Sequence, residues 1–511
     1  MCKATGVNAH ARLEEGERAI RSHVWRIHDR DYDLSSFVRD HPGGPMILLG
    51  KGSDCTMLFE SYHAFNEPRK RLRKHDVTPD GLSPPVPPCP SAFLVDVHAM
   101  VREHFAKQPK FAHKAHGCQL LAIATLFVLE IAAAWYWLAF RSWIAGAVAG
   151  MLNYLIMVNA AHDGSHGALS GRKWLNSLGH FAGGAPWVTG QFSWWLQHVV
   201  SHHQHTNELG LDVDVTHFPF ARWHRLMQHE ICGGVCAGIH NLVWHTVTFL
   251  GATLSMSIIH PIMFVWRPMC QMACSGKLSA AYTGEVTSAP MPRAKLRLGD
   301  NAHDAAFAKY AGIFASSGSG CYSYALVAGN LVCLILSIGL LVLPVALSPS
   351  QWPSGIGLGL VPYASASLCF MFITQISHIQ EDCQSERTMN EPDPYKRQAM
   401  TSLDYGAHSS LVSFLTGSLN VQSVHHTLPS ISLVHYTALY DKFHAICVTH
   451  DCAPQSASSL VHAIGAHIKY VYRLGRGDEF GKGKEMAAVA EPAKKLPLCE
   501  NESASMSAAK P

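Results

Sequence analysis

The stretch WIAGAVAGMLNYLIMVNAAHDGSH, residues 143–166, decides the fold, because a long apolar run ends directly in a pair of histidines. The run QLLAIATLFVLEIAAAWYWLAF precedes it at 119–140, and only Arg141 and Ser142 separate the two. A helix needs about 20 apolar residues to cross a hydrocarbon core, and both runs approach or exceed this length. So short a connector makes two helices antiparallel neighbours, and we expect a helical hairpin.

A second pair of apolar runs occupies 324–347 and 355–377, joined by the short segment 348–354. It predicts a second hairpin and brings the number of expected spans to four. The connector 348–354 contains no lysine or arginine, whereas 267–320 contains six. The excess of positive charge in cytoplasmic loops therefore places 267–320, and with it the large loops, in the cytosol.

A fifth apolar run, 241–266, carries His245, His260 and many Ser and Thr residues. If the histidines before and after it form one site, an even number of spans must separate them, and the second hairpin already supplies two. We therefore expect 241–266 to lie in the membrane interface or against the bundle rather than to cross the bilayer.

The composition of the 511 residues excludes several classes of protein. Apolar residues make up 48% of the chain and charged residues 15%, with 40 Lys and Arg against 37 Asp and Glu. This near-balance gives no indication of a nucleic-acid partner, and the apolar content excludes a disordered chain. The 33 histidines direct attention to metal and haem sites.

Three histidine groups flank the predicted hairpins. Within a helix, residues three or four apart lie on one face, so each group can direct its donor atoms to one place. Imidazole suits iron, and several converging imidazoles suit two metals. His378 adds a further candidate ligand just past the fourth span, at the expected depth of such a centre. The groups are His162 with His166, His198 with His202 and His203, and Gln422 with His425 and His426.

A different histidine pattern marks the polar N-terminal region. His41-Pro42-Gly43-Gly44 is followed 22 residues later by His63. Two imidazoles on opposite faces of a haem fill both axial positions, which suits electron transfer and leaves no position for oxygen. This segment resembles cytochrome b5 over about residues 16–80, and the resemblance implies that His41 and His63 are the axial ligands of haem b.

The chain as a whole resembles the membrane-bound front-end fatty acyl desaturases that carry an N-terminal cytochrome b5 domain. The similarity runs from about residue 16 to 475 and rests on five motifs. They are HPGG at 41–44, HDGSH at 162–166, QHVVSHHQHTN at 197–207, QISH at 375–378 and LNVQSVHHTLPSIS at 419–432.

The resulting expectation is a mainly α protein. A small α+β cytochrome b5-like haem domain precedes a four-span transmembrane helical bundle with a cytosolic cap that carries the histidines. The expected divisions are an N-terminal tail at 1–15, the haem domain at 16–80, a Pro-rich linker at 81–92, the membrane desaturase domain at 93–476 and a disordered tail at 477–511.

The resemblance also implies the site. In the family, the histidine motifs bind a di-iron centre, and the third motif begins with glutamine, as it does here at Gln422. We expect Gln422 to be a weaker donor or to contact a ligand. Catalysis is expected to rest on the three motif groups. The implied iron ligands are His162, His166, His198, His202, His203, His378, His425 and His426.

The implied reaction is an oxygen-dependent desaturation of a fatty acyl chain carried by CoA or phospholipid. Electrons come from NADH-cytochrome b5 reductase through the haem, O2 is reduced to water, and two hydrogens leave adjacent methylenes. The expected location is the endoplasmic reticulum membrane. An apolar tunnel must position the chain, and Trp187, Trp194 and Trp195 are candidates for its wall or entry, with an interfacial role as the alternative.

The stretch MTSLDYGAHSSLVSFLTGSLNVQSVHH at 400–426 resembles Δ5 desaturases that act on C20 polyunsaturated chains. The alternatives are a Δ4 or Δ6 acyl desaturase, a sphingolipid long-chain-base Δ8 desaturase and a di-iron hydroxylase. A non-enzymatic alternative is a membrane haem electron carrier whose histidines are vestigial or transport metal. Transport calls for ionisable residues in mid-span, where this chain has only Glu130.

Overall fold

The computed structural model describes residues 23–65, 67–79, 89, 91–188, 190–209, 211–215, 221–227, 234–262 and 320–478. Most of the predicted 81–92 linker lies outside these ranges. So do the predicted tail at 1–15, nearly all of the 267–320 segment, and the C-terminal tail beyond residue 478.

The N-terminal module, residues 23–79, is a small α+β unit. Strands β1 (Trp25–Ile27) and β2 (Arg30–Tyr32) form an antiparallel hairpin in which Trp25 pairs with Tyr32. His28 and Asp29 form its turn with positive φ angles of 50° and 62°. Short helices complete the module: η2 (Gly44–Gly50), α1 (Thr56–Tyr62), α2 (Glu67–Leu72) and η3 (Arg73–His75).

The first predicted hairpin is confirmed as a pair of antiparallel helices, α4 (Gly117–Phe140) and α5 (Trp143–Ile156). Arg141 reverses the chain with a left-handed φ of 52°, and the Ser142 hydroxyl caps α5 by accepting the Ala145 amide. Beyond Ile156 the helix widens into a π-helical turn, η4 (Met157–Ala161), and continues as α6 (His162–Ser165).

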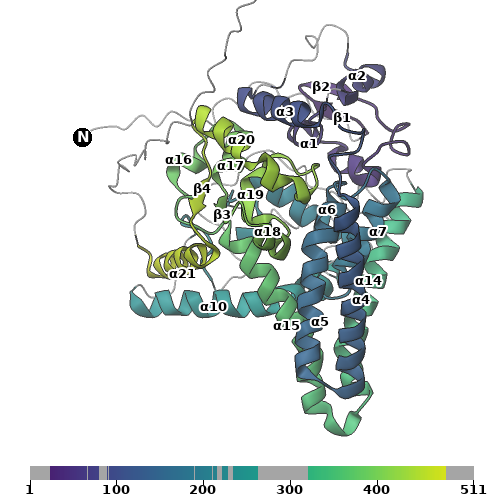
Figure 1. Cartoon of the computed structure of the whole chain (residues 1–511), viewed down its shortest axis with the longest axis vertical. Coiled ribbons are helices and arrows are strands. Elements are labelled where there is room, and N and C mark those ends of the chain that lie inside the picture. Colours follow the sequence, from purple (N-terminus) through teal and green to yellow (C-terminus); the bar gives the residue numbers. More distant parts are fainter. Residues whose placement is uncertain are drawn as a thin grey trace, which may run out of the picture. The chain divides into compact units, whose positions relative to one another are not determined.

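The second predicted hairpin is also present, as α14 (Gly320–Ala346), η9 (Pro349–Gln351) and α15 (Trp352–Ile376). Helix α15 packs against both α14 and α5, and these helices run side by side in Figure 1. Gly150 permits the α5–α15 contact, since a Cβ there would lie 2.1 Å from the Pro362 carbonyl oxygen. The Trp137 indole donates to the Leu358 carbonyl (3.1 Å) and ties α4 to α15.

The fifth apolar run forms α10 (Val235–Leu254) and a π-helical turn, η7 (Ser255–Ile259). Within the described residues, five helices are long and apolar enough to cross a membrane, and α10 with η7 is one of them. Figure 1 shows that α10 and α21 (Leu460–Arg476) run roughly perpendicular to α4, α5 and α15.

The remaining elements form a cap at one end of the two hairpins (Figure 1). One apolar core of the cap joins α3 (Ala92–Phe105) to α20 (Tyr436–Thr449) and includes Phe93, Tyr436 and Phe443. The cap also contains a two-stranded parallel sheet formed by β3 (Leu403–Tyr405) and β4 (Gln455–Ala457). The other cap elements are α7 (Lys173–Gly184), α8 (Gln191–Trp194), η5 (Trp195–His202), α9 (His203–His205), η6 (Val213–Val215), α16 (Glu386–Met389), α17 (Pro394–Met400), α18 (Ser410–Thr416), η10 (Leu419–Val421), α19 (Gln422–Thr427) and η11 (Leu433–His435).

Candidate metal centre

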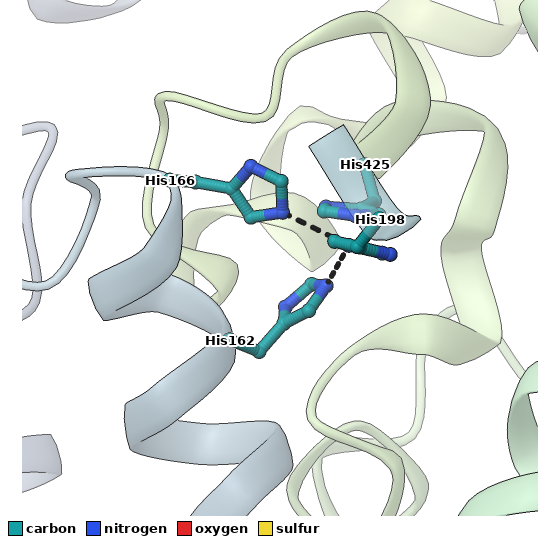
Figure 2. A group of neighbouring side chains, drawn as sticks. All are labelled: His162, His166, His198 and His425. Atoms are coloured by element: carbon teal, nitrogen blue, oxygen red, sulfur yellow. Dashed lines mark hydrogen bonds between the residues drawn. The ribbon is translucent and has the colours of Figure 1, made fainter. Parts of the chain in front are cut away.

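Four histidines from three distant segments meet where the cap joins the hairpins, and we call them the first cluster: His162, His166, His198 and His425. One nitrogen from each lies within 4.8 Å of the others. The Nε2 atom of His198 is 3.1 Å from Nε2 of His162 and 3.1 Å from Nε2 of His166. Figure 2 shows the four rings directed at one another, and all four side chains are buried.

A second cluster consists of His202, His378 and His426, whose nitrogens also lie within 4.8 Å of one another. The Gln422 amide lies beside it, with Nε2 3.0 Å from Nε2 of His378 and 3.2 Å from Nε2 of His426. The amide oxygen Oε1 has no hydrogen-bond partner among the described residues. A 180° flip of the side-chain amide would point Oε1 at the same two imidazoles.

His203 lies between the two clusters. Its ring stacks on His426 with centroids 4.4 Å apart, and its Nε2 atom is 3.1 Å from that of His198. The structure therefore brings together all eight histidines that the sequence predicts to be iron ligands, with Gln422 at the edge.

The geometry of the middle motif differs from the α-helical spacing that the sequence suggested. Helix η5 is a π-helix, in which hydrogen bonds join residues five apart. With this spacing the side chains of His198 and His203 lie next to each other. The side chain of His202 instead points to the second cluster. In this π-helical conformation one motif supplies histidines to both clusters.

Contacts behind the imidazoles orient them. Nδ1 of His378 donates to the Thr401 carbonyl (2.9 Å), and Nδ1 of His202 lies 3.2 Å from a carboxylate oxygen of Asp212. Such outer partners fix the tautomer of a metal-binding histidine and leave Nε2 for the metal. Asp212 was not predicted to be such a partner; its one signal in the sequence is the Asp-Val-Asp segment at 212–214, ten residues after His202.

Two observations show that the residues fit bound metal. Nε2 of His425 is buried within the first cluster, with no hydrogen-bond partner among the described residues. Burial also lowers the pKa of His198, His203, His425 and His426 well below 6.5, and that of His378 to about 3. These imidazoles are therefore neutral at physiological pH, the form that binds metal.

His202 is the exception, since its pKa rises to about 9. Burial lowers this pKa, but the adjacent carboxylates of Asp212 and Asp214 outweigh it. The second cluster thus has one buried carboxylate, Asp212, and one partly buried carboxylate, Asp214, behind one of its histidines, and their negative charge favours a bound cation.

The predicted haem ligands face each other in the N-terminal module. The ring centroids of His41 and His63 are 6.2 Å apart. This separation would leave room for a metal ion between the two rings, since bonds from a metal to imidazole nitrogen are roughly 2 Å long. The Nδ1 atoms contact the carbonyls of Gly44 (3.3 Å) and Phe59 (2.8 Å), so Nε2 of each ring is left for haem iron.

A small cavity lies beside both clusters, and Trp194, one of the three candidates for a tunnel wall, lines it. Trp187 and Trp195 do not line it. Trp187 packs against Trp137, and the Trp195 indole donates to the Ser165 carbonyl (2.9 Å). The other lining residues are Met157, His162, Gln197, His198, His202, Asp214, Phe370, Met371, Thr374, Gln375, Leu419 and Gln422.

Comparison with known proteins agrees with this geometry. Residues 137–284 and 297–457 match the family described as fatty acid desaturase, and residues 14–79 match the cytochrome b5-like heme/steroid binding domain. An acyl-lipid omega-13 desaturase of Chlamydomonas reinhardtii is 27% identical over 94% of this chain and 98% of its own.

Two proteins of Dictyostelium discoideum are also similar over nearly their full length. The probable Delta(5) fatty acid desaturase C is 24% identical over 93% of this chain and 95% of its own. The Delta(5) fatty acid desaturase A is 25% identical over 88% of this chain and 90% of its own.

Proposed function

This chain belongs to the fatty acid desaturase family and carries a cytochrome b5-like domain, and on that premise we propose that it is a Δ5 front-end desaturase of polyunsaturated acyl chains. The convergence of eight buried histidines from separate segments carries the proposal. An unactivated C–H bond offers no acidic proton or leaving group, so side chains alone have no means of breaking it.

We assign the first iron to the first cluster (His162, His166, His198 and His425) and the second iron to the second cluster (His202, His378 and His426). His203, which contacts members of both, completes one of the two coordination shells, and Gln422 contributes its amide oxygen or holds His378 and His426 in place. A di-iron centre held there supplies the oxygen chemistry. The chain's own residues fix the imidazoles and exclude bulk water, and Trp194 and Phe370 line the small cavity where the reacting carbons of the acyl chain would approach the clusters.

His41 and His63 hold haem b in this proposal. NADH-cytochrome b5 reductase is the proposed external donor of electrons, and the haem domain, linker and membrane domain are taken as 16–80, 81–92 and 93–476. The acyl substrate is carried by CoA or by a phospholipid.

The proposed topology has four spans, formed by α4, α5, α14 and α15, with α10 lying in the membrane interface. Two observations support it. Helix α10 crosses the direction of the hairpins in Figure 1. In addition, its residues Val235, Ile239, Val243, Val247 and Leu250 expose an apolar stripe at helical spacing, as an interfacial helix does. The positive charge of 267–320 favours a cytosolic cap, in the endoplasmic reticulum membrane.

The names of the relatives sharpen the question of which bond is formed. A double bond 13 carbons from the methyl end of an 18-carbon chain begins at carbon 5 from the carboxyl end, since 18 − 13 = 5. In a 20-carbon chain the same methyl-end count gives carbon 7. An omega-13 enzyme and a Δ5 enzyme therefore make the same product from C18 chains and different products from C20 chains.

The test is expression in yeast, fed separately with an 18-carbon Δ9,12 acid and a 20-carbon Δ11,14 acid, with mass spectrometry to locate the new bond. The proposal predicts a new bond at carbon 5 in both. A bond at carbon 7 of the C20 acid would show counting from the methyl end, and a bond at carbon 4, 6 or 8 would contradict Δ5 selectivity.

A further inference from the structure

The N-terminal module is held against the cap by several contacts. The Arg102 guanidinium of α3 donates to the Ala64 carbonyl (2.9 Å), and the Lys173 ammonium of α7 donates to the Arg39 carbonyl (2.7 Å). Ala64 is itself buried in the apolar core that joins α3 to α20. These contacts bring the C-terminal end of α1 to the first cluster.

The last residue of α1, Tyr62, and the residue that follows it, His63, contact different histidines. His63 is directed at His41, and its ring stacks on Phe59 with centroids 4.7 Å apart. The preceding residue, Tyr62, places its hydroxyl oxygen 2.5 Å from Nδ1 of His166. One peptide bond therefore separates the proposed haem ligand from a side chain that contacts the proposed iron site.

The direction of this hydrogen bond follows from the other nitrogen of His166. Its Nε2 atom faces the first cluster, 3.1 Å from Nε2 of His198. A neutral imidazole that binds metal through Nε2 carries its proton on Nδ1. Nδ1 of His166 is thus the donor, and the Tyr62 hydroxyl oxygen is the acceptor.

We propose that Tyr62 is a positioning residue that couples the two centres: it orients His166 and completes a continuous route of bonds from His63 to the first cluster. This inference rests on the proposed function. Each use of the route moves one electron, so that one ferrous haem becomes ferric and one ferric ion in the cluster becomes ferrous. Tyr62 keeps its own hydroxyl proton, and the external reductase restores the haem.

Tyr436 provides a matched comparison within the same cluster. Its hydroxyl lies 3.3 Å from Nδ1 of His425, a longer contact than the 2.5 Å between the Tyr62 hydroxyl and Nδ1 of His166. Tyr436 is the first residue of α20 and is not adjacent in the sequence to either proposed haem ligand. Replacing each tyrosine with phenylalanine therefore removes an acceptor behind one imidazole of the first cluster, but only Tyr62→Phe interrupts the route to the haem.

The experiment uses the full-length protein loaded with haem and iron, without oxygen or acyl substrate. The haem is reduced by a flash of light with a photosensitiser, and its reoxidation by the ferric centre is followed by absorbance. We expect Tyr62→Phe to keep its haem spectrum and to slow this step about tenfold or more, equivalent to about 1.4 kcal/mol in activation free energy. Tyr436→Phe is expected to stay within about threefold of the unmodified chain.

Two results would overturn the inference: a Tyr62→Phe rate within about twofold of the unmodified chain, or an equal slowing in both variants. Partial loss of iron does not obscure the outcome. An intramolecular rate constant is independent of how many molecules are loaded, and the amplitude reports the loading. Failure of the proposed function would appear separately, as absence of a new double bond in cells that express the unmodified chain.

Discussion

Replacing Asp212 with asparagine is expected to weaken iron binding at the second cluster while the haem stays in place. Asp212 is 1% exposed. Its oxygens accept from His202 Nδ1 (3.2 Å) and from the amides of Asn207 (2.7 Å) and Asp214 (3.0 Å). The amide nitrogen of asparagine cannot accept a hydrogen bond. In either orientation of the new side chain, this nitrogen faces an N–H group that has lost its acceptor, which costs about 1–3 kcal/mol of stability.

The loss extends to metal binding because Asp212 is one of the carboxylates behind His202. Removing a partner of this kind lowers metal affinity about 10–100-fold, or about 1.4–2.7 kcal/mol in binding free energy. The assay is non-haem iron per haem after dialysis against increasing chelator. Haem is an internal reference, since separate residues bind it.

Asp214→Asn is the matched control. Its carboxylate lies 3.5 Å from Nδ1 of His202 and its side chain is 15% exposed, so a smaller loss of iron is expected. The reasoning is refuted if Asp212→Asn releases iron at the same chelator concentration as the unmodified chain, or if Asp214→Asn loses iron more readily.

Three further predictions concern the proposed haem ligands and the buried histidines of the clusters. His41→Ala should lose the six-coordinate haem spectrum, because only His63 remains as an axial ligand; an unchanged spectrum contradicts the assignment. His425→Ala should abolish the new double bond in yeast at an unchanged protein level, since Nε2 of His425 is a proposed ligand atom of the first cluster, and near-normal product would remove it from the ligand set. In iron-free protein the melting temperature should fall as pH drops below 6.5. The pKa of His378 is about 3 when folded and that of His203 is well below 6.5, so only the unfolded chain gains protons there, and a flat profile between pH 7 and 5 would contradict this.

Local pattern sufficed to predict the two hairpins and the convergence of the histidines. The short connector after Phe140 leaves α4 and α5 no arrangement but an antiparallel one. Histidines at span ends must then lie at the same depth. For that reason even His378, which belongs to none of the three histidine groups, could be identified from its position.

Features that depend on tertiary contacts escaped prediction. In the π-helix η5 hydrogen bonds join residues five apart instead of four, and the sequence WLQHVVSH carries no signal for this change. Tyr62 was missed because its partner, His166, lies 104 residues away. Trp187 and Trp195 resemble Trp194 in type and neighbourhood, and only packing decides which of them faces the cavity.

The most direct test of this account is a count of non-haem iron per haem in the purified full-length protein, with Mössbauer spectroscopy to identify the iron. Seven buried histidines in two adjoining clusters, with His203 between them, predict two non-haem irons per haem. Protein that retains its haem but contains zinc, or no metal, in the clusters would contradict the account.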